Sequence, residues 1–485
     1  MRQAKLIIRD EVNVKIEGLE LDARRTFTNR FKYDVPYARY LPAVRLGRWD
    51  GKVSYFQLGG STFVNLLPEI IPMLDEMGYD IELDDQRTYS NNFQFRKIDN
   101  RAYANITWPR GHPLAGQAIE LRDYQVTVIN DFLANPQCIQ EIATGAGKTV
   151  ITAALSQTVE NYGRSIVIVP NKSLVTQTEK DYVNLGLDVG VYFGDRKDYN
   201  HKHVICTWQS LNNILKNTKA GVGNVTMGEF LKDVVCIIVD EVHMAKADVL
   251  KTMLTSYMAH IPIRWGLTGT IPKEDFESKA LLVSLGPVIN RLAASELQER
   301  GVLAQCHVNV VQLVDHVEHT NYQSELKYLL EESGRLDTMA RLIQQVNETG
   351  NTLVLVDRIS AGEALIARLS NAVFVSGGTK AAERQEHYDE VAEATDKIIV
   401  ATYGVAAVGI NIPRIFNLVL IEPGKSFVRV IQSIGRGIRK AEDKDFVQIW
   451  DITSTCRFAK RHLTKRKQFY REANYPFTQE KLEWK

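Results

Sequence analysis

The segment EIATGAGKTVIT, residues 141–152, places small residues, a lysine and a threonine between two apolar stretches. Small residues let backbone N–H groups close around a phosphate, the Lys148 ammonium can reach the β and γ oxygens, and the Thr149 hydroxyl can ligate Mg²⁺. Ile142 stands where the generic motif has its first glycine, so the match is incomplete. The alternative is a tight turn between a strand and a helix, with Lys148 only solvated. We predict a nucleotide-binding loop whose small residues are Thr144, Gly145, Ala146 and Gly147.

Two adjacent acids follow a second apolar run, VVCIIVDEVH, and are Asp240 and Glu241. The carboxyl ends of buried parallel strands are where ligands bind in α/β folds. We predict that Asp240, together with Thr149, holds Mg²⁺, and that Glu241 orients and deprotonates an attacking water. The alternative is a pair of ordinary solvated loop residues. The presence of the lysine-containing loop favours phosphoryl chemistry.

A third motif, QSIGRGIRK, spaces Gln432, Arg436 and Arg439 four and three residues apart. A helix would put all three side chains on one face. Two arginines presented together suit the negative charge that develops on a transferring γ-phosphoryl group, where such residues contribute about 10³–10⁵ in rate. The alternative is a helix with a solvated basic face. The arginines therefore favour ATP hydrolysis over mere binding.

The upstream motif LRDYQ adds Arg122 and Gln125 to the predicted nucleotide site. The Gln125 amide could read an adenine edge. By itself this motif is a weak signal.

The apolar pattern indicates the elements that must position these residues. From about residue 112 to 300, wholly apolar runs recur between helical segments: SIVIVP, HVICT, VVCIIVDE and WGLTGT. The rhythm restarts after ELQERGVLA with NTLVLV, VFVSG, KIIVAT, NLVLIEP and FVQIWDI. Runs that are apolar on both faces predict parallel sheets covered on both sides, so we expect two α/β domains in tandem.

Ahead of these, short β-like runs and one probable helix, LPEIIPMLDEMG, predict a small α+β domain. The expected borders are 1–110 for an accessory domain that binds DNA, 111–300 for the ATP-binding domain, and 301–485 for a second domain with a basic C-terminal helix.

Composition sets the class of protein. The 485 residues are 45% hydrophobic and 24% charged, which is typical of a globular chain. The net charge of +1 provides no global basic field, so any nucleic-acid site must arise from local patches. The five cysteines form no CxxC pair, which predicts reduced thiols and neither zinc nor disulfides. Without a signal peptide or membrane span, the expected location is cytoplasmic, in the host cytoplasm if the chain is phage-encoded.

The ordered motifs LRDYQ, ATGAGKT, VPNKSLVTQ, TWQSL, DEVH, LTGT, ATYGVAAVGINIP and QSIGRGIR resemble superfamily two helicases, which have two RecA-like domains. The DEVH and LTGT motifs are similar to those of UvsW-type phage repair and recombination helicases, as is the N-terminal stretch YARYLPAVRLGRWDGKVSYF. The resemblance covers about residues 1 to 470. It implies an ATP- and Mg²⁺-dependent motor.

The resemblance also implies roles by position. Gln125 would recognise adenine, Lys148 and Thr149 the phosphates and metal, and Gln432, Arg436 and Arg439 would complete the site. Gly409, in the ATYGVAAVGINIP motif, is assigned to the nucleotide. Asn411 stands where many relatives have an aspartate for the ribose, which puts the sugar contact and strict nucleotide selectivity in doubt. The residues that would couple the ATP site to the nucleic-acid path are His243, Thr268 and Thr270.

Polar residues after strand ends are the expected phosphate contacts, which position a strand without reading its sequence. In the first domain these are Asn171, Lys172, Thr207, Trp208 and Gln209, and in the second Arg358, Ser376, Gly377 and Thr402. Taken alone, each is as readily an ordinary loop residue.

Residues 24–52 interleave basic side chains with aromatic ones, including Arg45, Arg48 and Lys52. This composition suits neutralisation of a phosphate backbone with stacking or wedging against bases. The alternative is a stability module whose aromatics form a core. A second basic run, at residues 456–471, can equally be a solvated face.

The predicted function is an ATP-dependent DNA helicase or translocase that acts on branched DNA in recombination and repair, with recombination proteins as possible partners. The alternatives are a motor subunit of a restriction or nuclease complex, an RNA helicase and, less favoured, a nucleotide-binding switch without motor activity.

Overall fold

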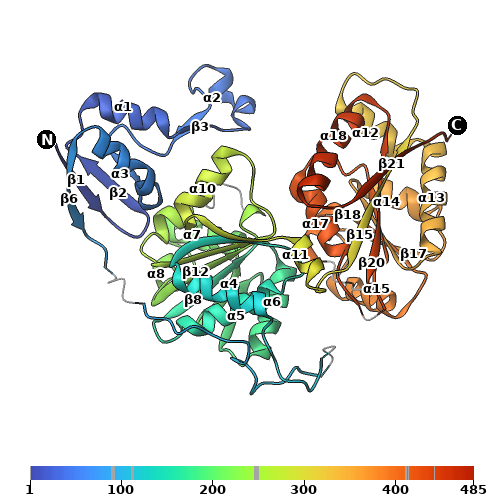
Figure 1. Ribbon diagram of the computed structural model, residues 1–485, viewed down its shortest axis with the longest axis horizontal. Coiled ribbons are helices and arrows are strands. Elements are labelled where there is room, and N and C mark those ends of the chain that lie inside the picture. Colours follow the sequence, from blue (N-terminus) through green and yellow to red (C-terminus); the bar gives the residue numbers. More distant parts are fainter. Residues whose placement is uncertain are drawn as a thin grey trace. The chain divides into compact units, whose positions relative to one another are not determined.

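The computed structural model describes residues 2–88, 93–110, 114–244, 251–409, 412, 414–441 and 443–484. The chain divides into two compact units, of which one comprises Met1–Ile142 with Gly147–Arg291 and the other Ala143–Ala146 with Leu292–Lys485 (Figure 1). Among the described residues, no helix has the length and apolarity needed to cross a bilayer. The predicted α/β class, with tandem parallel sheets and a small α+β region ahead of them, is confirmed. The residue borders of the three domains stay a prediction.

The N-terminal module, residues 2–85, is built on a four-stranded sheet in the order β5-β2-β1-β6. Alternate residues of β1 are buried, as expected for a strand with one face on a core. In α3 the buried residues Leu67, Ile70 and Leu74 recur at helical spacing. The strands of this sheet are β1 (Arg2–Ile8), β2 (Asn13–Glu17), β5 (Ser61–Phe63) and β6 (Tyr79–Asp85), and its helices are α1 (Leu21–Arg30) and α3 (Leu67–Glu76).

Helix α10 (Asp275–Leu285) belongs to two hydrophobic cores at once. Its residues Phe276, Ala280 and Val283 pack into the core of the N-terminal module, whereas Leu281 and Leu285 join the core of the eight-stranded sheet of the first unit. The Tyr55 hydroxyl donates to the Phe276 carbonyl at 3.1 Å, and Lys279 pairs with Glu69 at 2.6 Å. The module is therefore packed onto the first unit rather than carried on a free linker.

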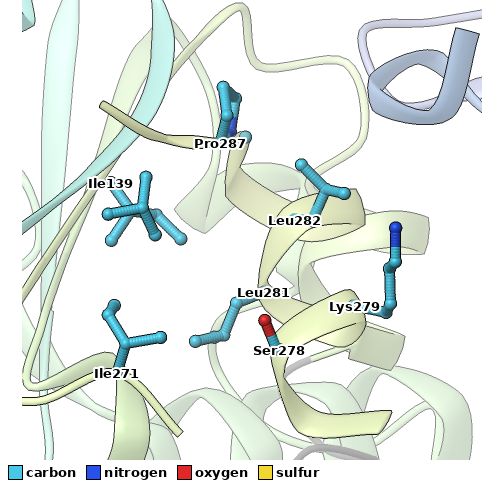
Figure 2. Close-up of a pocket in the computed structure, with 9 residues that line it drawn as sticks. Ile139, Ile271, Ser278, Lys279, Leu281, Leu282 and Pro287 are labelled. Carbon is cyan, nitrogen blue, oxygen red and sulfur yellow. The ribbon is translucent and has the colours of Figure 1, made fainter. Parts of the chain in front are cut away.

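A cavity of about 220 Å³ lies between α10 and the strand that leads to the phosphate loop. Figure 2 shows Leu281 directed from α10 toward Ile271, with Ile139 of β7 close by. The packing of α10 on the eight-stranded sheet is thus incomplete here. A small displacement of the helix therefore breaks fewer van der Waals contacts.

The larger sheet of the first unit has eight strands in the order β10-β9-β11-β8-β12-β13-β7-β14. Pairing is parallel from β9 to β7, and β10 pairs antiparallel with β9. The central strands are buried along their whole length, so the sequence has wholly apolar runs there. Its strands are β7 (Gln137–Ile142), β8 (Arg164–Val169), β9 (Val189–Phe193), β10 (Arg196–Lys197), β11 (His203–Thr207), β12 (Val234–Asp240), β13 (Ile263–Thr268) and β14 (Val288–Leu292).

Two groups of helices cover this sheet (Figure 1). Helix α5 (Lys148–Val159) packs against both α4 (Asp123–Ala134) and α6 (Lys172–Asn184). The core that also contains α10 includes α7 (Trp208–Ala220) and α8 (Met227–Phe230). A short α11 (Ala294–Glu299) follows β14.

The second unit has a seven-stranded parallel sheet in the order β17-β18-β16-β19-β20-β15-β21. Its strands are β15 (Gln305–Leu313), β16 (Thr352–Val356), β17 (Ala372–Val375), β18 (Ile398–Thr402), β19 (Asn417–Ile421), β20 (Phe446–Ser454) and β21 (Phe477–Leu482). Its helices are α12 (Tyr322–Glu331), α13 (Ser333–Asn347), α14 (Ile359–Ile366), α15 (Ala381–Glu393), α16 (Tyr403–Gly409), α17 (Phe427–Gly437) and α18 (Arg457–Glu472).

Candidate nucleotide-binding and hydrolysis site

The loop between β7 and α5 has the backbone that a phosphate-binding loop requires. Gly145 and Gly147 have φ angles of +92° and +80°, in the left-handed region that side chains rarely adopt. A Cβ atom at Gly147 would lie 2.6 Å from Nε2 of Gln125, so a larger residue would also crowd this side chain. Helix α5 begins directly at Lys148, which turns its first N–H groups toward the loop.

Lys148 is held by an ion pair across the site. Its Nζ lies 2.9 Å from Oε1 of Glu241 and donates to the Ile142 carbonyl at 3.4 Å. The Lys148 and Glu241 side chains are only 9% and 11% exposed. The structure therefore brings the predicted phosphate lysine and the predicted catalytic acid into direct contact.

Asp240 and Glu241 have opposite pKa shifts. Burial, together with the negative charge of Glu241, raises the pKa of Asp240 to about 7. Burial also favours a higher pKa for Glu241, but the charges of Lys148 and His243 outweigh it and lower that pKa to about 2. Glu241 also has a φ of +53°, an unfavourable conformation for a non-glycine residue that is concentrated at functional sites. The pair therefore combines one ionised acid with one that titrates near neutral pH.

A chain of polar contacts joins Glu241 to the LTGT motif. The Gly269 N–H donates to Oε2 of Glu241 at 3.3 Å, and Nδ1 of His243 lies 2.6 Å from the Thr268 hydroxyl. The Thr268 hydroxyl donates in turn to the Thr270 carbonyl at 2.8 Å. The predicted coupling residues thus contact one another, and Nδ1 of His243 lies 3.5 Å from Oε2 of Glu241, the predicted catalytic acid. Their coupling role stays a prediction.

Thr149 has a partner that the sequence did not indicate. Its hydroxyl donates a hydrogen bond to Oδ2 of Asp181, a residue of α6. Burial raises the pKa of Asp181, and the hydrogen bond from Thr149 opposes that shift. A lone aspartate in a helix carries no motif, so only the packing of α6 against α5 could reveal this contact.

The residues present fit Mg²⁺ and a nucleoside triphosphate. A hydroxyl and carboxylates are hard oxygen donors of the kind Mg²⁺ prefers, and the positive φ angles of Gly145 and Gly147 form the turn that precedes the helix N-terminus. Asp240 and Thr149 would hold the metal, and Lys148 the phosphates. When bound, the metal would neutralise charge on the phosphate oxygens.

Gln125 and Arg122 lie at the start of α4 in the same unit. The Gln125 side chain is buried, and its Oε1 accepts the Arg122 backbone N–H at 2.9 Å. Arg122 donates to the Tyr124 hydroxyl at 2.9 Å. The short distance from a Cβ at Gly147 to Nε2 of Gln125 places Gln125 beside the phosphate loop, and its reading of adenine stays a prediction.

The helix prediction for the arginine motif is correct for Gln432 and Arg436 but wrong for Arg439. Helix α17 contains the first two and ends at Gly437, whereas Arg439 lies beyond it in a β-bridge with Leu303. Glycine has a low helix propensity, and the Ala304 N–H donates to the Ile438 carbonyl at 2.8 Å, so the chain leaves the helix there. Gly409 ends α16, and Asn411 lies outside the described residues.

The predicted nucleic-acid residues of the first unit collect at one sheet edge. Asn171 and Lys172 follow β8. Thr207 ends the neighbouring strand β11, and Trp208 and Gln209 come directly after it, at the carboxyl ends where Asp240 and Thr268 also lie. Asn171 and Thr207 cap α6 and α7, because their side-chain oxygens accept N–H groups of the first turn. The Trp208 side chain packs into the core, while Gln209 is exposed.

A similar arrangement occurs in the second unit. Arg358, Ser376 and Thr402 lie at the carboxyl ends of β16, β17 and β18, which are adjacent strands. Arg358 donates to Gln323 at 3.1 Å, and Gly377 is exposed in the turn that follows Ser376. Contact of either sheet edge with nucleic acid stays a prediction.

The basic segment of the N-terminal module has two kinds of aromatic residue. Phe27 and Phe31 are fully buried and belong to the module core, while Tyr37 and Tyr40 are 41% and 59% exposed. The basic side chains around the exposed tyrosines are themselves exposed and lie in α2 (Pro42–Arg45), the following loop and β4 (Lys52–Ser54), namely Arg45, Arg48 and Lys52. Both sequence interpretations therefore apply, each to different residues.

Comparisons with known proteins match two segments of this chain. Residues 118–273 match the family described as "Type III restriction enzyme, res subunit", and residues 334–441 match "Helicase conserved C-terminal domain". The chain is 25% identical over 448 residues to "ATP-dependent DNA helicase uvsW" of Enterobacteria phage T4, covering 88% of this chain and 86% of that protein.

It is also 26% identical over 343 residues to "Putative DNA 3'-5' helicase Rad25" of Halobacterium salinarum, covering 68% of this chain and 54% of that one. Among solved structures, a putative HsdR subunit of a type I restriction enzyme from Vibrio vulnificus matches with a TM-score of 0.56. That match has 16% identity and covers 97% of this chain and 85% of the other, so it supports the fold alone.

Proposed function

Since this chain is a superfamily two DNA helicase of the UvsW type, an enzyme that hydrolyses ATP, we propose that it uses this hydrolysis to remodel branched DNA. The products would be migrated four-way junctions and regressed forks, in recombination and repair. The observation that carries this proposal is the exposed basic and aromatic surface of residues 37–52 on a module packed against the ATP-binding unit.

The chemistry of that surface suits a DNA duplex. Arg45, Arg48 and Lys52 can neutralise phosphates and release counterions, and Tyr37 and Tyr40 offer faces on which bases can stack. Because the module packs on α10, which begins shortly after the LTGT motif, a movement of that motif would reach the bound duplex. A motor that only tracks a single strand has no need of this surface.

The ATP site supplies the power stroke in this proposal. Lys148 would exchange its contact with Glu241 for the phosphates, which frees Glu241 to orient and deprotonate a water. Gly269 and His243 sense the position of Glu241 through their contacts with its carboxylate. Arg436 and Arg439 would stabilise the charge on the γ-phosphoryl group.

The experiment neutralises the surface without disturbing the core. Arg45, Arg48 and Lys52 are changed together to Gln, and a control changes Arg2, Lys5 and Arg9 of the same module. Removal of residues 1–110 is unsuitable, because it would expose the apolar face of α10 that carries Phe276, Ala280 and Val283.

The triple variant should keep ATP hydrolysis stimulated by single strands and lose migration of four-way junctions. The salt dependence of its junction binding should flatten by up to about 2.7 in the slope of log K against log salt, at about 0.9 per lost phosphate contact. The control variant should behave as the wild type. Full junction activity in the folded triple variant would rule out the proposed grip.

One observation favours a second candidate, a motor subunit of a restriction complex. The first family match, over residues 118–273, is to the res subunit of type III restriction enzymes. Such a subunit would move along duplex DNA without resolving junctions. Translocation on linear duplex combined with no activity on four-way junctions would support this candidate over the first.

A further inference from the structure

Thr149 contacts a residue, Asp181, that lies outside the helicase motifs. Thr149 is the second residue of α5 and a predicted metal ligand, and its hydroxyl donates to Oδ2 of Asp181. Asp181 reaches it from α6, whereas the other predicted metal ligand, Asp240, ends β12. The threonine hydroxyl is thus bonded to α6, a helix that contains neither of the two predicted metal ligands.

The surroundings hold Asp181 firmly in place. The next residue, Tyr182, is fully buried, and its hydroxyl donates to the Thr152 carbonyl at 3.1 Å and lies 2.5 Å from the Ser156 hydroxyl. Two consecutive residues of α6 therefore contact three residues of α5 that lie on successive turns. The Asp181 carboxylate has little freedom to follow Thr149 if that side chain moves.

A hydroxyl group has one proton and two lone pairs. When the Thr149 proton points to Asp181, the lone pairs point elsewhere, and one of them is available to a cation. A carboxylate acceptor also makes the hydroxyl oxygen a stronger ligand, as the partners of metal-bound histidines do for imidazole. Without the acceptor, the proton can turn toward the metal position and oppose binding there.

We propose that Asp181 is a positioning residue that orients the Thr149 hydroxyl for Mg²⁺ bound with the nucleotide. This inference rests on the proposed nucleotide site. Asp181 makes no contact with phosphate in this scheme, because its effect passes entirely through Thr149. It should therefore change the contribution of the metal to nucleotide affinity and leave metal-free nucleotide binding unchanged.

The test measures binding rather than turnover. The Kd of a fluorescent ADP is determined with excess Mg²⁺ and again with EDTA, and the ratio of the two values is the metal enhancement. The variants are Asp181→Ala, Asp181→Asn, Thr149→Val and the double change Asp181→Ala with Thr149→Val. The control is Glu179→Gln, which removes a carboxylate of the same helix that pairs with Arg196 at 2.7 Å.

Asp181→Ala should reduce the metal enhancement about tenfold or more, the usual effect of removing the partner of a metal ligand. Asp181→Asn, which keeps an acceptor oxygen, should lose less, and Glu179→Gln should match the wild type. In the Thr149→Val background, Asp181→Ala should have no further effect, since the residue through which it acts is absent.

Three results would overturn this inference and leave the proposed function standing. The first is an unchanged metal enhancement in Asp181→Ala. The second is an equal loss in the Thr149→Val background, which would make Asp181 act independently of that hydroxyl. The third is a parallel loss of metal-free binding, which would indicate a displaced phosphate loop. A wild-type chain that binds no nucleotide in either condition would overturn the proposed function together with this inference.

Discussion

Glu241→Gln should tighten ATP binding while it abolishes hydrolysis. In the structure, the Glu241 carboxylate pairs with the Lys148 ammonium at 2.9 Å, in a site where both side chains are about one-tenth exposed. Phosphates must displace this carboxylate before Lys148 can reach them. The substitution removes the competing charge but keeps an amide oxygen that can accept a hydrogen bond from Lys148.

The magnitude follows from the geometry of the pair. Two unit charges 2.9 Å apart attract by about 6 kcal/mol at an effective dielectric constant of about 20. Most of this is balanced by the cost of burying the charges, and removal of one partner from a buried pair typically costs about 3–5 kcal/mol. We expect the hydrogen bond from Lys148 to the retained amide oxygen to offset much of this cost. Nucleotide-free Glu241→Gln should then lose about 1–3 kcal/mol of unfolding free energy, and its ATP affinity should rise about tenfold, or about 1.4 kcal/mol.

Two measurements check this prediction. Denaturant unfolding without nucleotide gives the loss of stability, and equilibrium binding of ATP with Mg²⁺ gives the gain of affinity. Lys148→Ala serves as the comparison, since it should weaken ATP binding. A folded Glu241→Gln protein that binds ATP more weakly than the wild type would refute the idea that the ion pair competes with phosphate.

Three further predictions follow from named contacts. Mg²⁺ binds the ionised form of Asp240, whose pKa is raised to about 7, so the metal enhancement of nucleotide affinity should fall about tenfold from pH 8 to pH 6. This fall should shrink in Glu241→Gln, which loses the negative charge that helps to raise the pKa of Asp240. A fall of the same size in that variant would contradict the assignment of the pH dependence to Asp240. Arg436→Ala and Arg439→Ala should each lower kcat by about 10²-fold or more with ATP affinity unchanged, and normal turnover in both would show that neither acts on the transition state. Phe276→Ala should lower the unfolding free energy by about 3–5 kcal/mol and lower the urea midpoint of the whole first unit. A separate, earlier unfolding transition of the N-terminal module would show that α10 does not join the two cores.

The parts of the fold that the sequence predicts are those set by local pattern. The runs SIVIVP, HVICT and VVCIIVDE became β8, β11 and β12 because strands buried on both faces need apolar residues throughout. The phosphate loop was equally predictable, since glycines with positive φ and a following helix are local requirements. The predicted resemblance to superfamily two helicases is likewise confirmed, by the family matches over residues 118–273 and 334–441.

The remaining features depend on packing between distant segments. The contact of Asp181 with Thr149 needs α6 to lie against α5, and no spacing rule relates residues in two separate helices. The division of α10 between two cores requires the N-terminal sheet to be in place. In the basic segment, Phe27 and Tyr40 look alike in sequence, yet one is buried and the other exposed because only tertiary structure decides which aromatics face the core.

The most direct test of the central claim measures ATP hydrolysis and junction products in the same reaction. A labelled four-way DNA junction, a linear duplex and an RNA duplex are compared, each with wild-type protein and with Lys148→Ala. The account predicts migration of the DNA junction only when ATP is hydrolysed, and no product from the Lys148→Ala protein. Vigorous ATP hydrolysis that leaves the junction unmoved, or stimulation by RNA alone, would contradict the proposed action on branched DNA.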